Sequence, residues 1–175
     1  MTSQLNVDTI ASKLGSTVGL SLDTSGNVTA SGNVTISGNP LTPARPAFMA
    51  RRYGGSVTVT NNYYPFASLT TDDAFSIGGH YDTSAYKFTC PVAGIYYFSC
   101  YVISQTSDVN TLLKIRKNGS DFAQSYAVQL STAWHTHNIA IHANAAVNDY
   151  FQIYIGGTMA GYGNQWAAFS GHLVG

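Results

Sequence analysis

Glutamate is absent from this sequence, and charge of either sign is scarce. All eight acidic residues are aspartates, charged residues make up 9% of the 175 positions, and the formal net charge is zero. An average soluble protein carries roughly 25% charged residues. Nucleic-acid binding needs a basic surface that contacts phosphates, so the composition argues against that class of function. A weakly charged surface gives little electrostatic repulsion between copies of the chain, so we expect much of it to be covered in an oligomer.

Cysteine and long apolar runs are also in short supply. Cys90 and Cys100 are the two cysteines. They match no zinc spacing and are too few for a disulfide scaffold, so we expect free thiols. The chain has no run of eighteen apolar residues, and MTSQLNVDTI at its start has no basic segment followed by an apolar one. The sequence therefore predicts neither membrane insertion nor secretion through a standard signal.

Glycine, serine, threonine, asparagine, tyrosine and valine are abundant, and they favour strands and turns over helices. Within residues 25–39, SGNVTASGNVTISGN, the triplet Ser-Gly-Asn occurs three times at a spacing of six. Each unit places two apolar side chains on one strand face, too few to bury a core alone. We expect three chains to associate, each contributing one strand per unit to a shared stalk whose axis is lined by Val28, Val34 and Ile36.

Two regions follow from the distribution of these signals. Residues 1–45 are predicted to be an attachment segment with a β-repeat stalk and a proline-rich neck. Pro40, Pro43 and Pro46 recur every third residue, as in an extended spacer. In residues 46–175, short strand-like runs alternate with glycine and asparagine turn signals. This rhythm predicts a single all-β sandwich as the head.

Residues 94–102 form the clearest predicted strand, and aromatic side chains alternate onto both of its faces. One face must pack on a second sheet, and the other on a sheet or a neighbouring subunit. The predicted core or subunit-interface residues are Tyr96, Tyr97, Phe98 and Tyr101. We further expect PVAG, residues 91–94, to turn a hairpin that places Cys90 opposite Ile95.

Spacing within this region matches a known pattern: an aromatic residue, six residues, phenylalanine, five residues, then Gly-x-Tyr-x-Phe. The matching residues are Tyr81, Phe88, Gly94, Tyr96 and Phe98. Further matches follow in order at 46–51, 80–82, 117–119, 148–155 and 169–174. Residues 46–175 thus resemble the globular head of complement C1q and its tumour necrosis factor relatives. The resemblance implies a jelly-roll sandwich that forms a compact homotrimer.

The N-terminal region resembles a different group of proteins. LNVDTI near the start, followed by SGNVT-type units, is similar to the N-terminal part of bacteriophage tail-fibre and other virion appendage proteins. The resemblance implies a virion protein whose N-terminal segment binds other virion proteins and whose head contacts a glycan or protein on the host surface. Two alternatives stay open: a capsid decoration or cement protein, and a secreted C1q-like ligand or lectin.

Residues that could carry chemistry are few. The sequence has neither a serine-centred elbow nor a phosphate-cradling glycine motif, and we expect no enzymatic activity. His135 and His137 lie two apart, so on a strand they face the same way. Close to a trimer axis they would offer six imidazole nitrogens to one transition metal ion, and no other cofactor is expected. The alternative is that both are solvated or hydrogen-bonded strand residues.

Aromatic residues near glycine-rich loops form the second candidate site. Rings held on a loop can stack on a sugar or fill a partner's pocket, although many such rings belong to the core. The candidate ligand-binding residues are Trp134, Tyr162 and Trp166.

Overall fold

The computed structural model describes residues 9–11, 18–22, 24, 28–30, 45–71, 73–105, 110–127 and 134–175. The chain divides into two compact units, Met1–Leu41 and Thr42–Gly175. Among the described residues, no helix has the length and apolar character needed to cross a bilayer.

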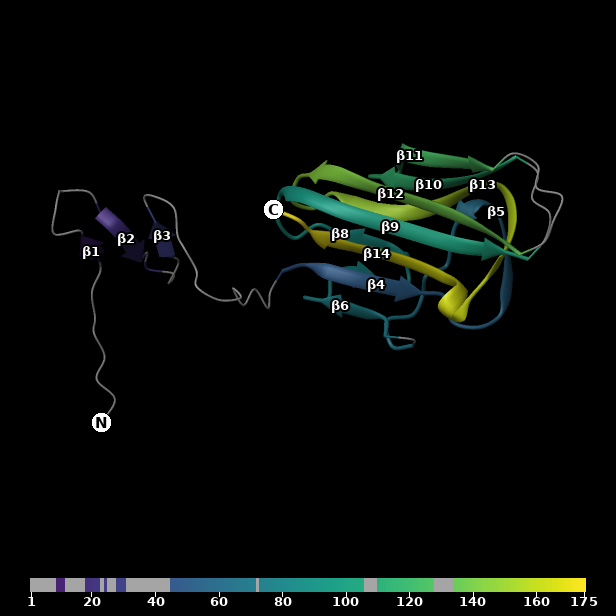
Figure 1. Ribbon diagram of the computed structural model, residues 1–175, viewed down its shortest axis with the longest axis horizontal. Helices are drawn as coiled ribbons and strands as arrows, with labels where there is room; N and C mark the ends of the chain where they lie inside the picture. Colours follow the sequence, from purple (N-terminus) through teal and green to yellow (C-terminus); the bar gives the residue numbers. More distant parts are fainter. Residues whose placement is uncertain are drawn as a thin grey trace. The chain divides into compact units, whose positions relative to one another are not determined.

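The smaller unit contains one three-stranded antiparallel sheet. Its strands are β1 (Thr9–Ala11), β2 (Val18–Leu22) and β3 (Val28–Ala30), in the order β1-β2-β3 (Figure 1). Val28 pairs with Leu22 of the same chain. The side chain of Val28, and Val34 and Ile36 altogether, lie outside the described residues. The predicted stalk axis therefore stays a prediction.

The larger unit, the head, has two antiparallel layers (Figure 1). The first, called here the β9 layer, contains β6 (Phe75–Ile77), β4 (Ala47–Arg51), β14 (Ala167–Leu173), β9 (Gly94–Ser104) and β12 (His135–Ala145), in that order.

The second layer, called the β13 layer, contains β7 (Tyr81–Asp82), β8 (Lys87–Thr89), β13 (Tyr150–Tyr162), β10 (Thr111–Lys117) and β11 (Ser120–Ala127). β5 (Ser56–Tyr63) pairs with the C-terminal part of β13. A short 3-10 helix, η1 (Asn164–Trp166), connects β13 to β14. The predicted all-β sandwich is confirmed.

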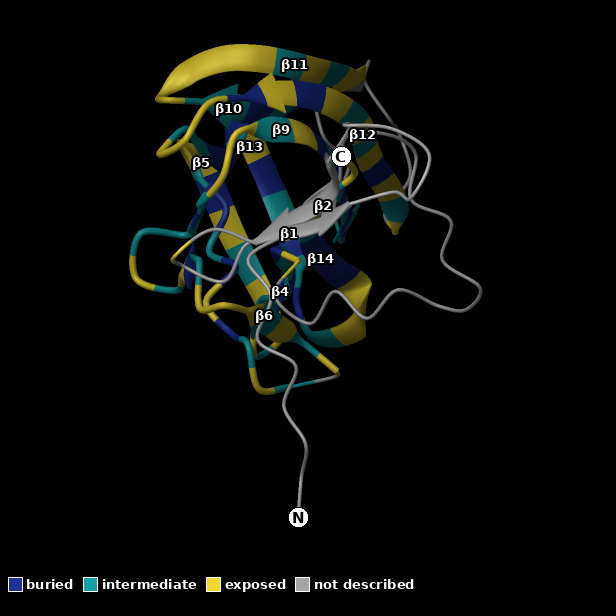
Figure 2. Ribbon diagram, turned by 90° about the vertical axis from the view of Figure 1, so that its left-hand side faces the viewer, coloured by how far each residue is buried: buried dark blue, intermediate teal, exposed yellow. Residues whose placement is uncertain are grey.

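The core lies between the two layers, where Figure 2 shows the buried residues. Every second side chain of β9 is buried from Tyr96 to Ser104, and the side chains between them face outward. β13 contributes Phe151, Ile153 and Ile155 from the opposite layer. The alternation is the period of a strand with one face on the core.

Aromatic rings fill the centre of this core. The Phe98 ring lies 4.2 Å from that of Phe151 and is stacked on Tyr96 at 6.0 Å, measured between centroids. A side chain at Gly171 of β14 would overlap the rings of Phe98 and Phe48, so glycine is required there. Close packing of this kind makes the core sensitive to changes in volume.

The predicted hairpin at residues 91–94 is wrong. β8 pairs with β7 and β13, whereas β9 pairs with β12 and β14, so the chain crosses from one layer to the other between them. The Cys90 amide donates to the carbonyl of Asp149 (2.8 Å) instead of facing Ile95, and Cys100 lies opposite Ile139. Proline and glycine mark a change of direction, and a crossing uses the same signals as a hairpin.

Both cysteines are free and buried. Burial raises the pKa of the Cys90 thiol to about 12 and that of Cys100 well above its usual value. Because the thiolate is the reactive form, both sulfurs are protonated and inert at neutral pH.

Among the described residues, Asp149 is the carboxylic acid whose pKa is lowered most. It accepts hydrogen bonds from Lys117 Nζ (2.8 Å), Asn118 Nδ2 (2.7 Å) and the Ala146 amide (2.7 Å). These three donors, with Lys117 the strongest, lower the pKa of Asp149 to about 2. Its folded-state pKa is below the unfolded value, so the group stabilises the fold above about pH 4 and loses this effect as the pH falls toward 2.

Replacing Asp149 by asparagine is therefore expected to lower the free energy of unfolding by roughly 1–2 kcal/mol at pH 7. The difference from the wild type should shrink between about pH 4 and pH 2, where the wild-type carboxylate becomes protonated. Urea unfolding at a series of pH values measures both effects, and Asp73→Asn, at an exposed position, is the matched control. An equal difference at pH 2 and pH 7 would contradict the assignment.

Candidate functional site

The N-terminal and C-terminal residues of the head lie together at one end of the sandwich. Arg45 Nη2 donates to the Val174 carbonyl (2.5 Å), and the Leu173 amide donates to the Pro46 carbonyl (3.0 Å). The opposite end, called here the remote end, holds the start of β12, the end of β13 and η1 (Figure 1). The remote end also includes the loop at residues 52–55, which is bonded to η1.

Hydrogen bonds fix this loop. The Arg52 guanidinium donates to the carbonyls of Tyr53 (3.1 Å) and Gly55 (2.6 Å). Asn164 Oδ1 accepts from the Gly54 amide (3.1 Å), and the Asn164 amide donates to the Arg52 carbonyl (2.7 Å). A loop held in this way presents its side chains in a fixed arrangement, which reduces the entropy cost of binding.

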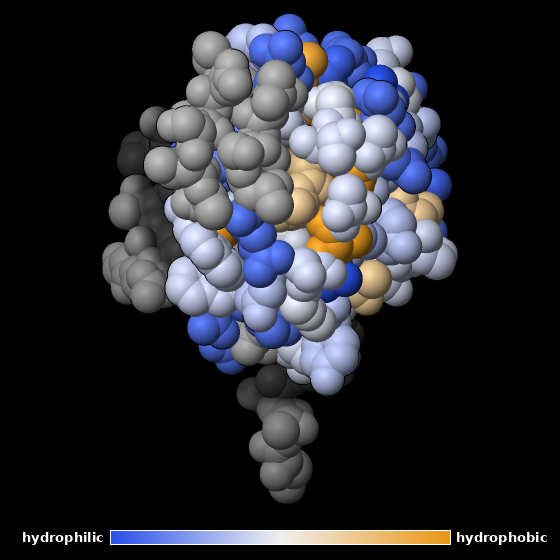
Figure 3. Space-filling view, turned by 90° about the vertical axis from the view of Figure 1, so that its right-hand side faces the viewer, coloured by the Kyte–Doolittle hydropathy of each residue, from blue (hydrophilic) through white to orange (hydrophobic). Residues whose placement is uncertain are grey.

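Large aromatic side chains are exposed at the remote end. Tyr53 is 72% exposed, Trp134 60% and Trp166 42%. The Trp134 ring meets the ring of Tyr162 edge to face at 5.7 Å. Trp134 also has a left-handed backbone (φ 64°), a conformation that is costly for a bulky residue and occurs often at binding sites. Figure 3 faces the remote end and shows apolar surface among mostly polar side chains.

The sequence-predicted ligand residues are thus all at the remote end. The structure brings Trp134 and Tyr162 into contact and places Trp166 in η1. Tyr53, the most exposed of the large apolar residues described, was missed by sequence reasoning, because Tyr53-Gly-Gly indicates a turn and nothing local indicates where the ring points.

His135 and His137 occupy the beginning of β12. Their Nε2 atoms are 3.0 Å apart. His137 is only 4% exposed, on the side of β12 that also carries the buried Ala143 and Ala145. The expectation that these imidazoles face a shared trimer axis is therefore wrong. Side chains alternate along a strand, so residues two apart face the same way, and here both face the interior of their own head.

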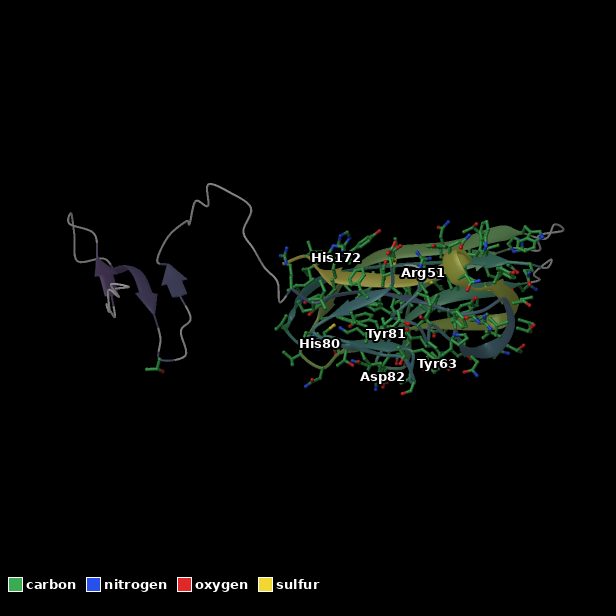
Figure 4. All side chains as sticks on the ribbon, turned by 90° about the horizontal axis from the view of Figure 1, so that it is seen from below. Arg51, Tyr63, His80, Tyr81, Asp82 and His172 are labelled. Carbon is green, nitrogen blue, oxygen red and sulfur yellow. The ribbon has the colours of Figure 1, made fainter. Side chains whose placement is uncertain are left out.

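The outer face of the β9 layer carries two of the predicted interface residues, Tyr97 and Tyr101. The Tyr97 ring lies between those of His142 (5.1 Å) and His172 (5.6 Å). Tyr101 Oη accepts from Arg51 Nη1 (3.0 Å) and donates to the Gln165 carbonyl (2.8 Å). Figure 4 labels Arg51 and His172, with His172 toward the C-terminal end. Tyr96 and Phe98, by contrast, are wholly core residues.

Small residues occupy the middle of the same face. Ser99 lies between Ala140 of β12 and Ser170 of β14, and Ser170 pairs with Met49 of β4. Among the described residues of the five strands in this layer, Arg51 carries the only fixed charge. This outer face is therefore nearly uncharged and flanked by tyrosines, properties typical of a surface that packs on another protein surface.

A two-layer antiparallel jelly roll with both ends together defines the class of this head. The family model for the C1q domain matches residues 47–174, and the chain belongs to the C1q domain family. C1q/TNF-like domains are typically binding or ligand modules rather than enzymes.

Solved structures of other proteins share this fold. The globular domain of zebrafish complement 1qA matches with a TM-score of 0.55 and 17% identity over 75% of this chain and 98% of that one. Murine APRIL at pH 5.0 matches with a TM-score of 0.55 and 9% identity (74% and 99% covered). The Eiger TNF of S. frugiperda matches with a TM-score of 0.53 and 9% identity over 75% of this chain and 94% of that one. At these identities the likeness concerns the fold.

Proposed function

We propose that this protein is a homotrimeric binding module in which the outer face of the β9 layer joins the copies and the remote end contacts a ligand on another surface. The observation that carries the first half is the nearly uncharged outer face around Ser99, with Tyr97 and Tyr101 on either side. C1q/TNF homologues are trimeric, which supports three copies rather than two. Packing these faces together removes tyrosine and small-residue surface from water.

The remote end of each head is the proposed recognition surface. Three copies joined along the β9 layer with their chain ends together would present three remote ends in the same direction. Each would offer the exposed rings of Tyr53, Trp134 and Trp166, and hydrogen bonds fix the loop that carries Tyr53 to η1. Exposed aromatic rings suit stacking on a sugar or insertion into a protein pocket, and repetition of a weak site raises avidity.

Replacing Trp134 by alanine tests the remote end. We expect labelled wild-type protein to be retained on a glycan array or on bacterial surfaces, and the variant to lose at least tenfold in apparent affinity, because the exposed ring supplies contact area. Phe122→Ala removes an aromatic ring of similar exposure from β11, away from the remote end, and should leave binding unchanged. Equal binding by wild type and Trp134→Ala would refute the recognition role.

We further propose that the module belongs to a bacteriophage virion, with residues 1–45 binding other virion proteins. Support comes from the N-terminal LNVDTI and SGNVT-type units, which stand where complement-type proteins carry collagen repeats. A secreted C1q-like ligand is the second candidate, favoured by the match of the head to a complement globular domain. The neighbouring genes distinguish these roles. Tail genes beside this gene would support a tail-fibre role, and capsid genes would support a decoration role. The absence of both kinds of gene would support a secreted ligand.

A further inference from the structure

The histidine pair at the start of β12 has a geometry that the proposed binding function does not use. The imidazole centroids of His135 and His137 are 4.9 Å apart, the ring planes meet at 61°, and the Nε2 atoms approach to 3.0 Å. The two Nε2 atoms are therefore within hydrogen-bonding distance of each other. In the absence of an ion, one imidazole N–H can donate to the other nitrogen.

The same separation suits two ligands of one metal ion. Imidazole nitrogens bind zinc or copper at about 2.0–2.1 Å, which places two of them about 2.9 Å apart at a right angle and about 3.3 Å apart in a tetrahedron. The distance of 3.0 Å falls within this interval. Nitrogen ligands favour Cu²⁺ over Zn²⁺, and both over Mg²⁺ or Ca²⁺.

The backbone holds the two rings in place. β12 pairs with β9 along its whole length, with His135 opposite Ser104 and His137 opposite Val102. His137 is 4% exposed and so has little rotational freedom, while the more exposed His135 gives access from solvent. Because the site is formed before an ion arrives, little ordering is required on binding.

We propose that His135 and His137 chelate one divalent transition ion, Cu²⁺ or Zn²⁺, through their Nε2 atoms, within each head rather than between copies. Trp134 precedes His135 and contacts Tyr162, so the ion would lie beside the aromatic surface of the remote end.

Quenching of tryptophan fluorescence by Cu²⁺ tests the proposal in the full-length protein. The chain has two tryptophans, so Trp166→Phe leaves Trp134 as the sole tryptophan, whose emission is excited selectively at the red edge of the absorption band. Titration with Cu²⁺ in a buffer that does not coordinate copper should give saturable quenching at one equivalent per chain. His135→Asn should weaken the apparent affinity at least tenfold, whereas His142→Asn, on the outward side of the same strand, should leave it unchanged.

Calorimetric titration with Zn²⁺ gives an independent measurement, with His137→Gln as a second variant and near-ultraviolet circular dichroism to verify folding. Loss of binding in folded His135→Asn or folded His137→Gln, together with retention in His142→Asn, supports the chelate. Absence of saturable binding to the wild type overturns it. Wild-type affinity in His135→Asn, or an equal loss in His142→Asn, also overturns it, because the ion would then lie elsewhere.

Discussion

Replacing Phe98 by alanine is expected to lower the free energy of unfolding of the head by about 3–5 kcal/mol. Phe98 is fully buried in β9, and its ring contacts those of Phe151, Tyr96 and Phe169 from both layers. Removal of the ring leaves a cavity that rigid aromatic neighbours cannot fill, so the loss includes both the transfer free energy and the cavity. Chemical denaturation followed by tyrosine and tryptophan fluorescence measures the change.

Phe122→Ala is the matched control for this experiment. The Phe122 ring on β11 is 45% exposed and meets Phe151 only edge to face at 6.1 Å. The same substitution should cost no more than about 1 kcal/mol there. Losses of equal size at the two positions would mean that Phe98 is not at the centre of the core.

Replacing Ser99 by glutamate is expected to convert the proposed trimer to monomers at micromolar concentration. Ser99 lies at the middle of the outer face of the β9 layer, opposite Ala140 and Ser170. Association would bury three carboxylates without partners, each at a cost of several kcal/mol. The fold of one head should survive, because the side chain faces away from the core.

Light scattering gives the mass of the wild type and of the variant directly. Thr58→Glu introduces the same charge at an exposed position of β5, in the other layer, and should remain trimeric. A wild type that is monomeric at micromolar concentration, or a Ser99→Glu protein that is still trimeric, would contradict the proposed interface.

The sequence predicts the fold well where a local pattern has one physical meaning. Alternation from Tyr96 to Val102 requires a strand with two different faces, and the structure buries the face with Phe98 and Cys100. The spacing of Tyr81, Phe88 and Gly94 also points to the family: Tyr81 and Phe88 are buried in the core, and Gly94 begins β9. Such information is contained in the order of residues along the chain.

Sequence reasoning failed where the answer depends on the second layer. Pro91 and Gly94 mark a turn, but whether the chain pairs back or crosses depends on which layer buries Tyr96. His135 and His137 must share a side, yet the choice between interior and outer face depends on how β12 pairs with β9. Exposure of Tyr53 likewise depends on hydrogen bonds between its loop and η1, which are 110 residues apart in the chain.

The position of the two chain ends has a mechanical consequence. β4 and β14 are neighbours, paired from Ala47–His172 to Arg51–Ala168. Tension between the entry at Pro46 and the exit at Gly175 would open this ladder like a zipper, breaking one backbone pair at a time. Tension between Pro46 and the remote end runs along the strands and loads many hydrogen bonds in shear together. A head tethered through its N-terminal side and gripping at the remote end would be pulled in its stronger direction.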